Sequence, residues 1–148
     1  GEPLIRAFDL RSGDERYEID DPGISSGAGA TTHEGRLYVH GAWGELTAIQ
    51  IDDGSTLYRT EISAGEGDEL PHDLRPIVHG SVILLPGNRV TMIRAEDGFP
   101  LRASIPTELI PDKLLVGESG WIYIVEASGQ LEAYAPIPHL SLVRGGGR

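Results

Sequence analysis

The sequence predicts an all-β protein, a β-propeller segment whose four-stranded antiparallel blades form an open or incomplete ring. The first observation behind this prediction is a repeated phrase, in which an alternating apolar strand leads through a Gly turn into a second strand. Its three clearest copies lie at 7–17, 48–58 and 92–102. The second is the spacing, because the strand before the turn recurs at intervals of 41, 44 and 41 residues. The aligned residues are Ile5, Leu46, Val90 and Leu131. A period of about 40–45 residues with four strands per unit is typical of propeller blades.

The third observation is that the apolar residues alternate. Leu37 and Val39 are two apart, as are Ile122 and Ile124. Helical repeats of similar length would need apolar residues at i, i+3, i+4 and i+7 instead. The 20 Gly and 10 Pro also suit a chain with many turns.

The strands of each unit are lettered A to D from the propeller axis outward. The first unit, 1–20, contains only a C strand at 4–9 and a D strand at 15–19. The next three units contain further strands, each B strand following a polar Gly turn and each C–D pair sharing a hairpin turn. In 21–62 we expect strands at 28–32, 36–40, 46–51 and 57–62. In 63–106 we expect them at 75–79, 81–85, 90–95 and 101–105, and in 107–144 at 113–116, 121–125 and 131–135, with 140–143 as a candidate D strand. Residues 145–148 are a Gly-rich tail, expected to be flexible.

Because the first unit lacks A and B strands, the strand count predicts a ring with open ends. Exposed sheet edges favour aggregation and are seldom left bare. Something beyond this chain should therefore complete the sheets. The favoured interpretation is a piece of a larger propeller, with a head-to-tail pair of copies and a small irregular four-blade closure as alternatives.

The composition excludes several classes of function. The net charge is −11, which argues against nucleic acid or anionic lipid as a partner. There is no Cys, so disulfides, thiolate metal sites and Cys nucleophiles are excluded. No apolar run approaches the roughly 20 residues of a membrane span, so no membrane insertion is expected.

The repeat resembles the PQQ-like repeat family, whose units follow the pattern Ala-x-Asp-x-x-x-Gly-x-x-x-Trp. The first copy has Ala7, Asp9, Gly13 and Tyr17 at this spacing, with Tyr in place of Trp. Later copies depart from it further. The second copy keeps Ala48 and Gly54 and has Gln50 and Tyr58 in place of Asp and Trp. The third copy keeps Gly98 and has Met92, Arg94 and Arg102 at the other positions, and the fourth keeps Ala133. The resemblance implies that the Ala packs against an aromatic residue of the next unit and that the Asp ties the C–D turn.

The resemblance also bears on function, because the family includes quinone-cofactor dehydrogenases, outer-membrane assembly scaffolds and kinase-attached sensors. The dehydrogenases use a quinone cradle with calcium, an Asp base and usually a vicinal disulfide. This chain has no Cys and about half the needed blades, so we expect neither PQQ nor catalysis. The favoured interpretation is a non-catalytic protein-interaction or sensing platform, in a periplasmic or cell-envelope setting that the resemblance alone implies. Its expected partner is protein: the remaining blades, another copy or a separate chain. The alternatives are a fragment of a quinoprotein-like enzyme and a small-ligand or Ca²⁺-binding sensor.

The candidate site residues lie in the D–A and B–C loops, which share one face of a propeller. The acidic D–A loop contains Glu66, Asp68 and Glu69, whose carboxylates could wrap Ca²⁺. The loop lacks the alternate-residue spacing of known calcium loops, so a solvated acidic loop is the favoured interpretation and no metal is assigned. Candidate partner-binding residues are Trp43, Glu45, His72, Asn88 and Arg89. No Ser-His-Asp order, phosphate loop or nucleophile elbow is recognisable, which again predicts a protein that is not an enzyme.

Overall fold

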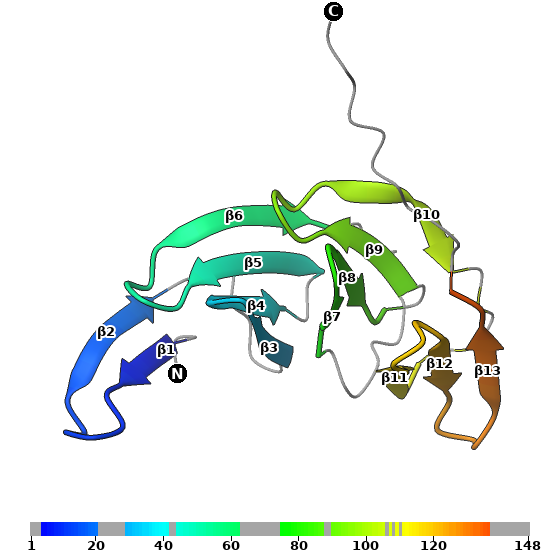
Figure 1. The fold of residues 1–148 in the computed structure, drawn as a ribbon, viewed down its shortest axis with the longest axis horizontal. Helices are drawn as coiled ribbons and strands as arrows, with labels where there is room; N and C mark the ends of the chain where they lie inside the picture. Colours follow the sequence, from blue (N-terminus) through cyan, green and yellow to red (C-terminus); the bar gives the residue numbers. More distant parts are fainter. Residues whose placement is uncertain are drawn as a thin grey trace, which may run out of the picture.

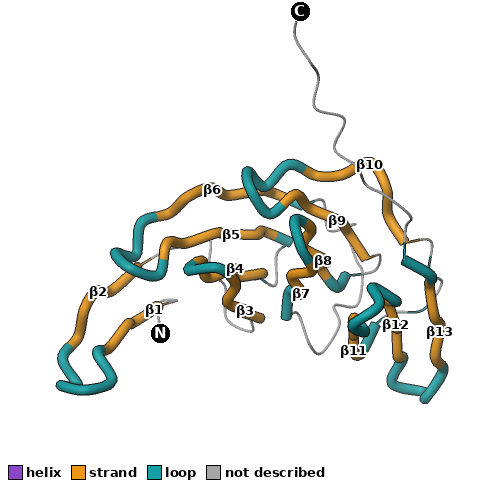
Figure 2. Tube along the Cα trace, in the orientation of Figure 1, coloured by secondary structure: helices purple, strands orange, loops and turns teal. Residues whose placement is uncertain are grey.

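The computed structural model describes residues 4–20, 29–41, 44–62, 75–87, 90–105, 107, 109 and 111–136. Within these ranges, 13 strands form four antiparallel sheets and there is no helix. The sheets follow one another along an arc whose two ends lie apart (Figure 1), and short turns connect neighbouring strands (Figure 2). The prediction of an all-β, open propeller segment is confirmed.

The first blade is a two-stranded sheet in the described residues. It consists of β1 (Leu4–Phe8) and β2 (Glu15–Asp20), with Ala7 opposite Tyr17. The turn between them is tied as the repeat implies, because the Asp9 carboxylate accepts backbone N–H bonds from Arg11 at 2.8 Å and Ser12 at 3.1 Å.

The second blade has all four strands in the order β3-β4-β5-β6. Its strands are β3 (Gly29–His33), β4 (Arg36–His40), β5 (Glu45–Gln50) and β6 (Thr56–Glu61). The outermost strand, β6, runs along the rim of the arc, and β3 lies on the inner side (Figure 1).

The third blade repeats this order with β7 (Ile77–His79), β8 (Val82–Leu85), β9 (Val90–Arg94) and β10 (Pro100–Ile105). The fourth blade has three described strands, β11 (Lys113–Val116), β12 (Ile122–Val125) and β13 (Leu131–Tyr134). The candidate D strand at 140–143 and the tail lie outside the described residues.

The core of the molecule lies between the blades, in three apolar clusters. Residues alternate between the two faces of a sheet, so each blade offers one face to the preceding blade and one to the following blade. Val39 and Ile49 of the second blade pack with Ile5 and Ile19 of the first. On the opposite face, Leu46 is grouped with Ile93 of the third blade. A further cluster joins the third and fourth blades around Val90, Met92, Ile122 and Ile124. Every blade therefore depends on its neighbours for burial, as expected of a repeat architecture.

Candidate functional site

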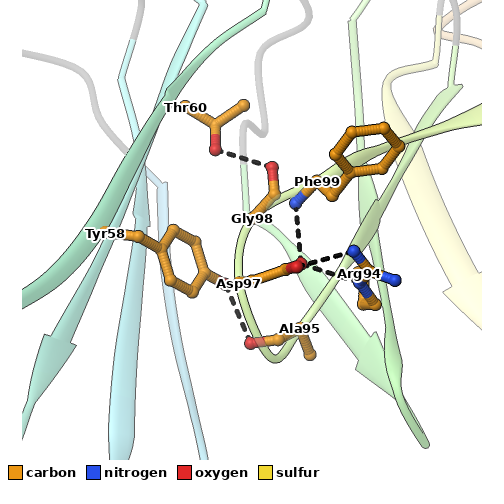
Figure 3. Close-up of polar contacts among 7 residues, drawn as sticks. All are labelled: Tyr58, Thr60, Arg94, Ala95, Asp97, Gly98 and Phe99. Atoms are coloured by element: carbon orange, nitrogen blue, oxygen red, sulfur yellow. Dashed lines mark hydrogen bonds and ion pairs between the residues drawn. The ribbon is translucent and has the colours of Figure 1, made fainter.

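Three side chains of the second blade converge on one carbonyl of the third blade. The Tyr58 hydroxyl donates a 3.0 Å hydrogen bond to the carbonyl of Ala95 (Figure 3), and Arg36 Nη1 donates another at 2.9 Å. The Tyr38 hydroxyl lies 3.5 Å from the same oxygen. Burial is the main cause that raises the pKa of Tyr58, which keeps the phenol protonated as a donor.

The Tyr58 ring also lies directly against the C–D turn of the third blade. Gly98 has a φ of +75°, and a Cβ added there would come within 2.5 Å of the Tyr58 ring. Thr60 Oγ1 donates a 2.7 Å hydrogen bond to the Gly98 carbonyl. Gly is required here both by the left-handed backbone and by the close approach of the ring.

The turn that receives Tyr58 is held by an ion pair. Arg94 Nε and Nη2 donate to the Asp97 carboxylate at 2.7 and 2.6 Å, and the Phe99 N–H donates to it at 3.1 Å (Figure 3). The Arg94 guanidinium lies 5.3 Å from the centre of the Phe99 ring. The hydrogen bond from Arg94 is the main cause that lowers the pKa of Asp97.

The first and second blades meet in the same way. The Tyr17 hydroxyl donates a 2.7 Å hydrogen bond to the Ile51 carbonyl, and a Cβ at Gly54 would lie 2.7 Å from the Tyr17 ring. The resemblance implied that Ala packs against an aromatic residue of the next unit. In the structure, Ala7 and Ala48 lie opposite Tyr17 and Tyr58 of their own hairpins. These tyrosines then reach forward to the next blade.

The last described sheet leaves its outer face open. Leu114, Ile122 and Ile124 belong to the cluster shared with the third blade, so the alternating residues point away from it. Those alternating residues are Leu115, Tyr123, Val125, Leu131 and Ala133. Leu115 is 54% exposed and Leu131 is 61% exposed. We call these five residues the open face.

At the other end of the arc, Phe8 is also an apolar residue that no described blade covers. Its repeat position corresponds to Ile49 and Ile93, which are fully buried, yet Phe8 is 52% exposed. In the second and third blades this position faces the preceding blade, so both ends of the arc expose apolar residues at positions that are buried between internal blades.

Most of the predicted site residues lie outside the described residues. These are Trp43, Glu66, Asp68, Glu69, His72, Asn88 and Arg89. Glu45 is described, at the start of β5, and is only 8% exposed. Its carboxylate lies against Gly41, where an added Cβ would collide with it, and its Oε1 has no hydrogen-bond partner. A role for Glu45 in partner binding would need a donor that reaches this buried oxygen.

The sequence predicts a ring with open ends, but the candidate residues chosen from it did not include those of the open face, although a signal for them was present. Leu131 aligns with Leu46 and Val90, and those residues are fully buried by the following blade. A leucine in this register with no described following blade predicts an exposed apolar position. Among the described residues, no group of three His, Asp or Glu side chains is placed to hold a metal ion. That part of the chain also contains no helix long and apolar enough to cross a membrane.

The structure matches solved propellers of distant sequence. BamB from Moraxella catarrhalis superposes with a TM-score of 0.68 and 15% identity, over 90% of this chain and 44% of BamB. The quinohemoprotein alcohol dehydrogenase from Comamonas testosteroni matches with a TM-score of 0.52 and 20% identity, over 69% of this chain and 18% of the enzyme. The chain has a partial PQQ-like β-propeller fold.

The computationally designed protein Ika4 is also similar, with a TM-score of 0.72 and 11% identity, over 92% of this chain and 81% of Ika4. This chain thus spans less than half of BamB and less than a fifth of the alcohol dehydrogenase. No protein-family model matches the sequence. No curated protein matches it either.

Proposed function

We propose that this chain is a non-catalytic propeller segment that acts as a protein-interaction platform, with the open face as its docking surface. The observation that carries the proposal is the contrast between Leu131 and Leu46. The two residues occupy the same repeat position, but Leu46 is fully buried and Leu131 is 61% exposed. The open face therefore offers the same kind of surface that holds the internal blades together.

The physical gain from covering this face is substantial. Burying a Leu or Val side chain contributes about 1.5–3 kcal/mol, so several such residues supply a strong drive for association. The junction between the second and third blades shows what kind of residue covers this position. There, Leu46 packs in one cluster with Ile93, and Ile93 stands at the repeat position of Phe8. The occupant that this pattern favours is another propeller blade with an apolar residue at that position. A second copy of this chain supplies one through Phe8.

The experiment uses the absence of Cys, because each introduced thiol is then unique. Chains with Leu131→Cys and chains with Phe8→Cys are mixed under mild oxidation and compared with a mixture of Leu131→Cys and Leu10→Cys chains. Leu10 is fully exposed and lies in the first C–D turn, so it is the matched control. We expect the 131–8 disulfide to form preferentially and the molar mass of the unmodified chain to rise with concentration. A monomer at every concentration, with equal crosslinking in both mixtures, would overturn docking by a second copy through the open face.

An alternative is that the chain is part of a quinoprotein-like enzyme. The similarity of its fold to that of an alcohol dehydrogenase supports testing this alternative. The test is addition of PQQ and Ca²⁺ followed by alcohol-dependent dye reduction. We expect no turnover above that of the cofactor alone. Turnover that depends on the chain would contradict the non-catalytic proposal.

A further inference from the structure

At the junction between the third and fourth blades, two large side chains of the preceding junction are replaced by smaller ones. Val82 pairs with Arg94 in the register in which Arg36 pairs with Gln50, so Val82 stands where Arg36 would. Leu84 pairs with Met92 as Tyr38 pairs with Ala48, so Leu84 stands where Tyr38 would. By its spacing from the turn Gly, the residue corresponding to Tyr58 is Arg102 in the sequence; its side chain lies outside the described residues.

A cavity of about 180 Å³ lies at this junction. Its walls are mostly apolar, and the described residues that line it include His79, Val82, Leu84, Met92, Ile122 and Pro136. Val82 and Leu84 are the two replacements described above, so the cavity lies where the preceding junction holds an Arg and a Tyr. Apolar cavities of about 150 Å³ are large enough to bind benzene, so this one accommodates a single aromatic ring.

The polar groups beside the cavity match a phenol. Pro136 has the same repeat position as Ala95, because each comes five residues after the aligned residues Leu131 and Val90. The Ala95 carbonyl accepts a hydrogen bond from the Tyr58 hydroxyl. His79 also lines the cavity, and its Nε2 would lie 3.5 Å from a Cβ built on Gly120. A carbonyl and an imidazole can each accept a hydrogen bond from a hydroxyl.

We propose that this cavity is a binding site for one phenolic ring, supplied by a free phenol or by a tyrosine side chain of a partner. The bound ring would occupy, at this junction, the place that Tyr38 occupies at the junction between the second and third blades. The site is distinct from the open face, because Leu84, Met92 and Ile122 belong to the cluster shared by the third and fourth blades. The proposal therefore stands or falls independently of the proposed function.

The experiment uses Met92, which is the only Met in the chain and lines the cavity. With ¹³C-methyl-Met labelling, the intact chain shows one methyl resonance that reports on the cavity. We expect p-cresol to shift this resonance upfield and saturably, through the ring current. Toluene has the same shape without the hydroxyl, and we expect it to bind about threefold to tenfold more weakly, the value of one hydrogen bond. 4-Methylcyclohexanol keeps the hydroxyl and the methyl group but has no aromatic ring, so it tests whether the flat ring itself is needed for binding.

Two substitutions that refill the cavity test its location. Leu84→Tyr gives the third blade the Tyr that the second blade has at position 38. Val82→Phe fills the cavity from a second position if the first variant does not fold. We expect each folded variant to lose at least tenfold in p-cresol affinity. Leu10→Tyr, on an exposed turn of the first blade, is the matched control and should bind as the parent chain does.

A second ligand distinguishes the two sources of the ring. If the blocked peptide acetyl-Gly-Tyr-Gly-amide produces the same Met92 shift, the site admits a tyrosine of a protein partner. If only p-cresol does so, the site takes free phenols. The absence of a saturable shift with either ligand, equal affinity for toluene and p-cresol, or full binding by a folded refilled variant would each overturn the proposal.

Discussion

The hydroxyl of Tyr58 donates a 3.0 Å hydrogen bond to the carbonyl of Ala95, which lies 37 residues away in the following blade. Tyr17 makes the equivalent bond to Ile51, 34 residues away, at 2.7 Å. Each ring also lies against the turn Gly of the blade that it reaches. The aromatic residue of the repeat therefore joins each of these blades to the next one through both a polar and a packing contact.

Removing the two hydroxyls should have unequal effects. Ala95 also receives a bond from Arg36, whereas Tyr17 is the side chain that donates to Ile51. We expect Tyr17→Phe to lower the free energy of unfolding by about 1 kcal/mol and Tyr58→Phe by less. Urea unfolding followed by circular dichroism measures both. A larger loss for Tyr58→Phe would show that Arg36 does not compensate.

The turn glycines separate backbone strain from steric collision. Gly13 and Gly98 have φ values of +78° and +75°, but only Gly98 has a ring in the path of a Cβ. We expect Gly13→Ala to cost about 1–2 kcal/mol from the left-handed backbone alone. Gly98→Ala should cost a further 1–3 kcal/mol from overpacking against Tyr58. Equal losses of stability in the two variants would contradict the close approach of the ring.

Stability should fall in acid partly through Asp97. The hydrogen bond from Arg94 lowers its pKa below the ordinary value of 3.8, so the charged carboxylate favours the folded state. This stabilisation is complete above the ordinary pKa and is lost as the pH falls through the lowered folded pKa. We expect Asp97→Asn to show a smaller fall in urea midpoint than the parent between pH 5 and about pH 2, a range that extends to both sides of the ordinary Asp pKa of 3.8.

The double variant Arg94→Gln/Asp97→Asn checks the cause of this acid effect. Once Arg94 has been replaced, changing Asp97 should alter the pH dependence little. An undiminished effect of Asp97→Asn in that background would assign the lowered pKa to the other hydrogen bonds of the turn.

Replacing the Leu at one repeat position by Ala should cost much more stability in the second blade than in the fourth. Leu46→Ala removes a fully buried side chain and should cost about 2–5 kcal/mol. Leu131→Ala changes a 61% exposed side chain and should alter the stability of the dilute monomer by no more than about 0.5 kcal/mol. If Leu131→Ala were as costly as Leu46→Ala under these conditions, the face would be covered within a single chain.

Thr47 offers a substitution that should not weaken the fold. Its Oγ1 is buried without a hydrogen-bond partner, so Val can replace it with nearly the same shape and no unsatisfied hydroxyl. We expect Thr47→Val to leave the free energy of unfolding unchanged or to raise it by about 1 kcal/mol. A clear loss in thermal or urea unfolding would reveal an unseen partner of the hydroxyl.

Much of the architecture was predictable because the repeat is local. The alternating exposure along β2 and β6 follows from the period of a strand, and the Gly54 and Gly98 turns follow from the backbone conformation that a tight hairpin needs. The two-strand first blade also followed from counting, because β1 and β2 are the only strands described before the second blade begins.

The candidate site was predicted less well, because it depends on contacts between repeats. Loop composition directed attention to Trp43, Glu45 and the acidic loop, yet Glu45 is buried and the rest lie outside the described residues. Nothing in the order of residues says that Tyr58 will meet Ala95, or that Val82 and Leu84 will border a cavity beside Pro136.

The amino-acid order by itself determined where strands and turns form and that they group into blades of about forty residues, because these features depend on alternation and turn chemistry within a few neighbours. Only the tertiary structure decided which faces are covered and which junction has room for a ring. The physical reason is that burial depends on the blade that stacks on each sheet, so identical positions such as Leu46 and Leu131 differ only in what lies beyond them.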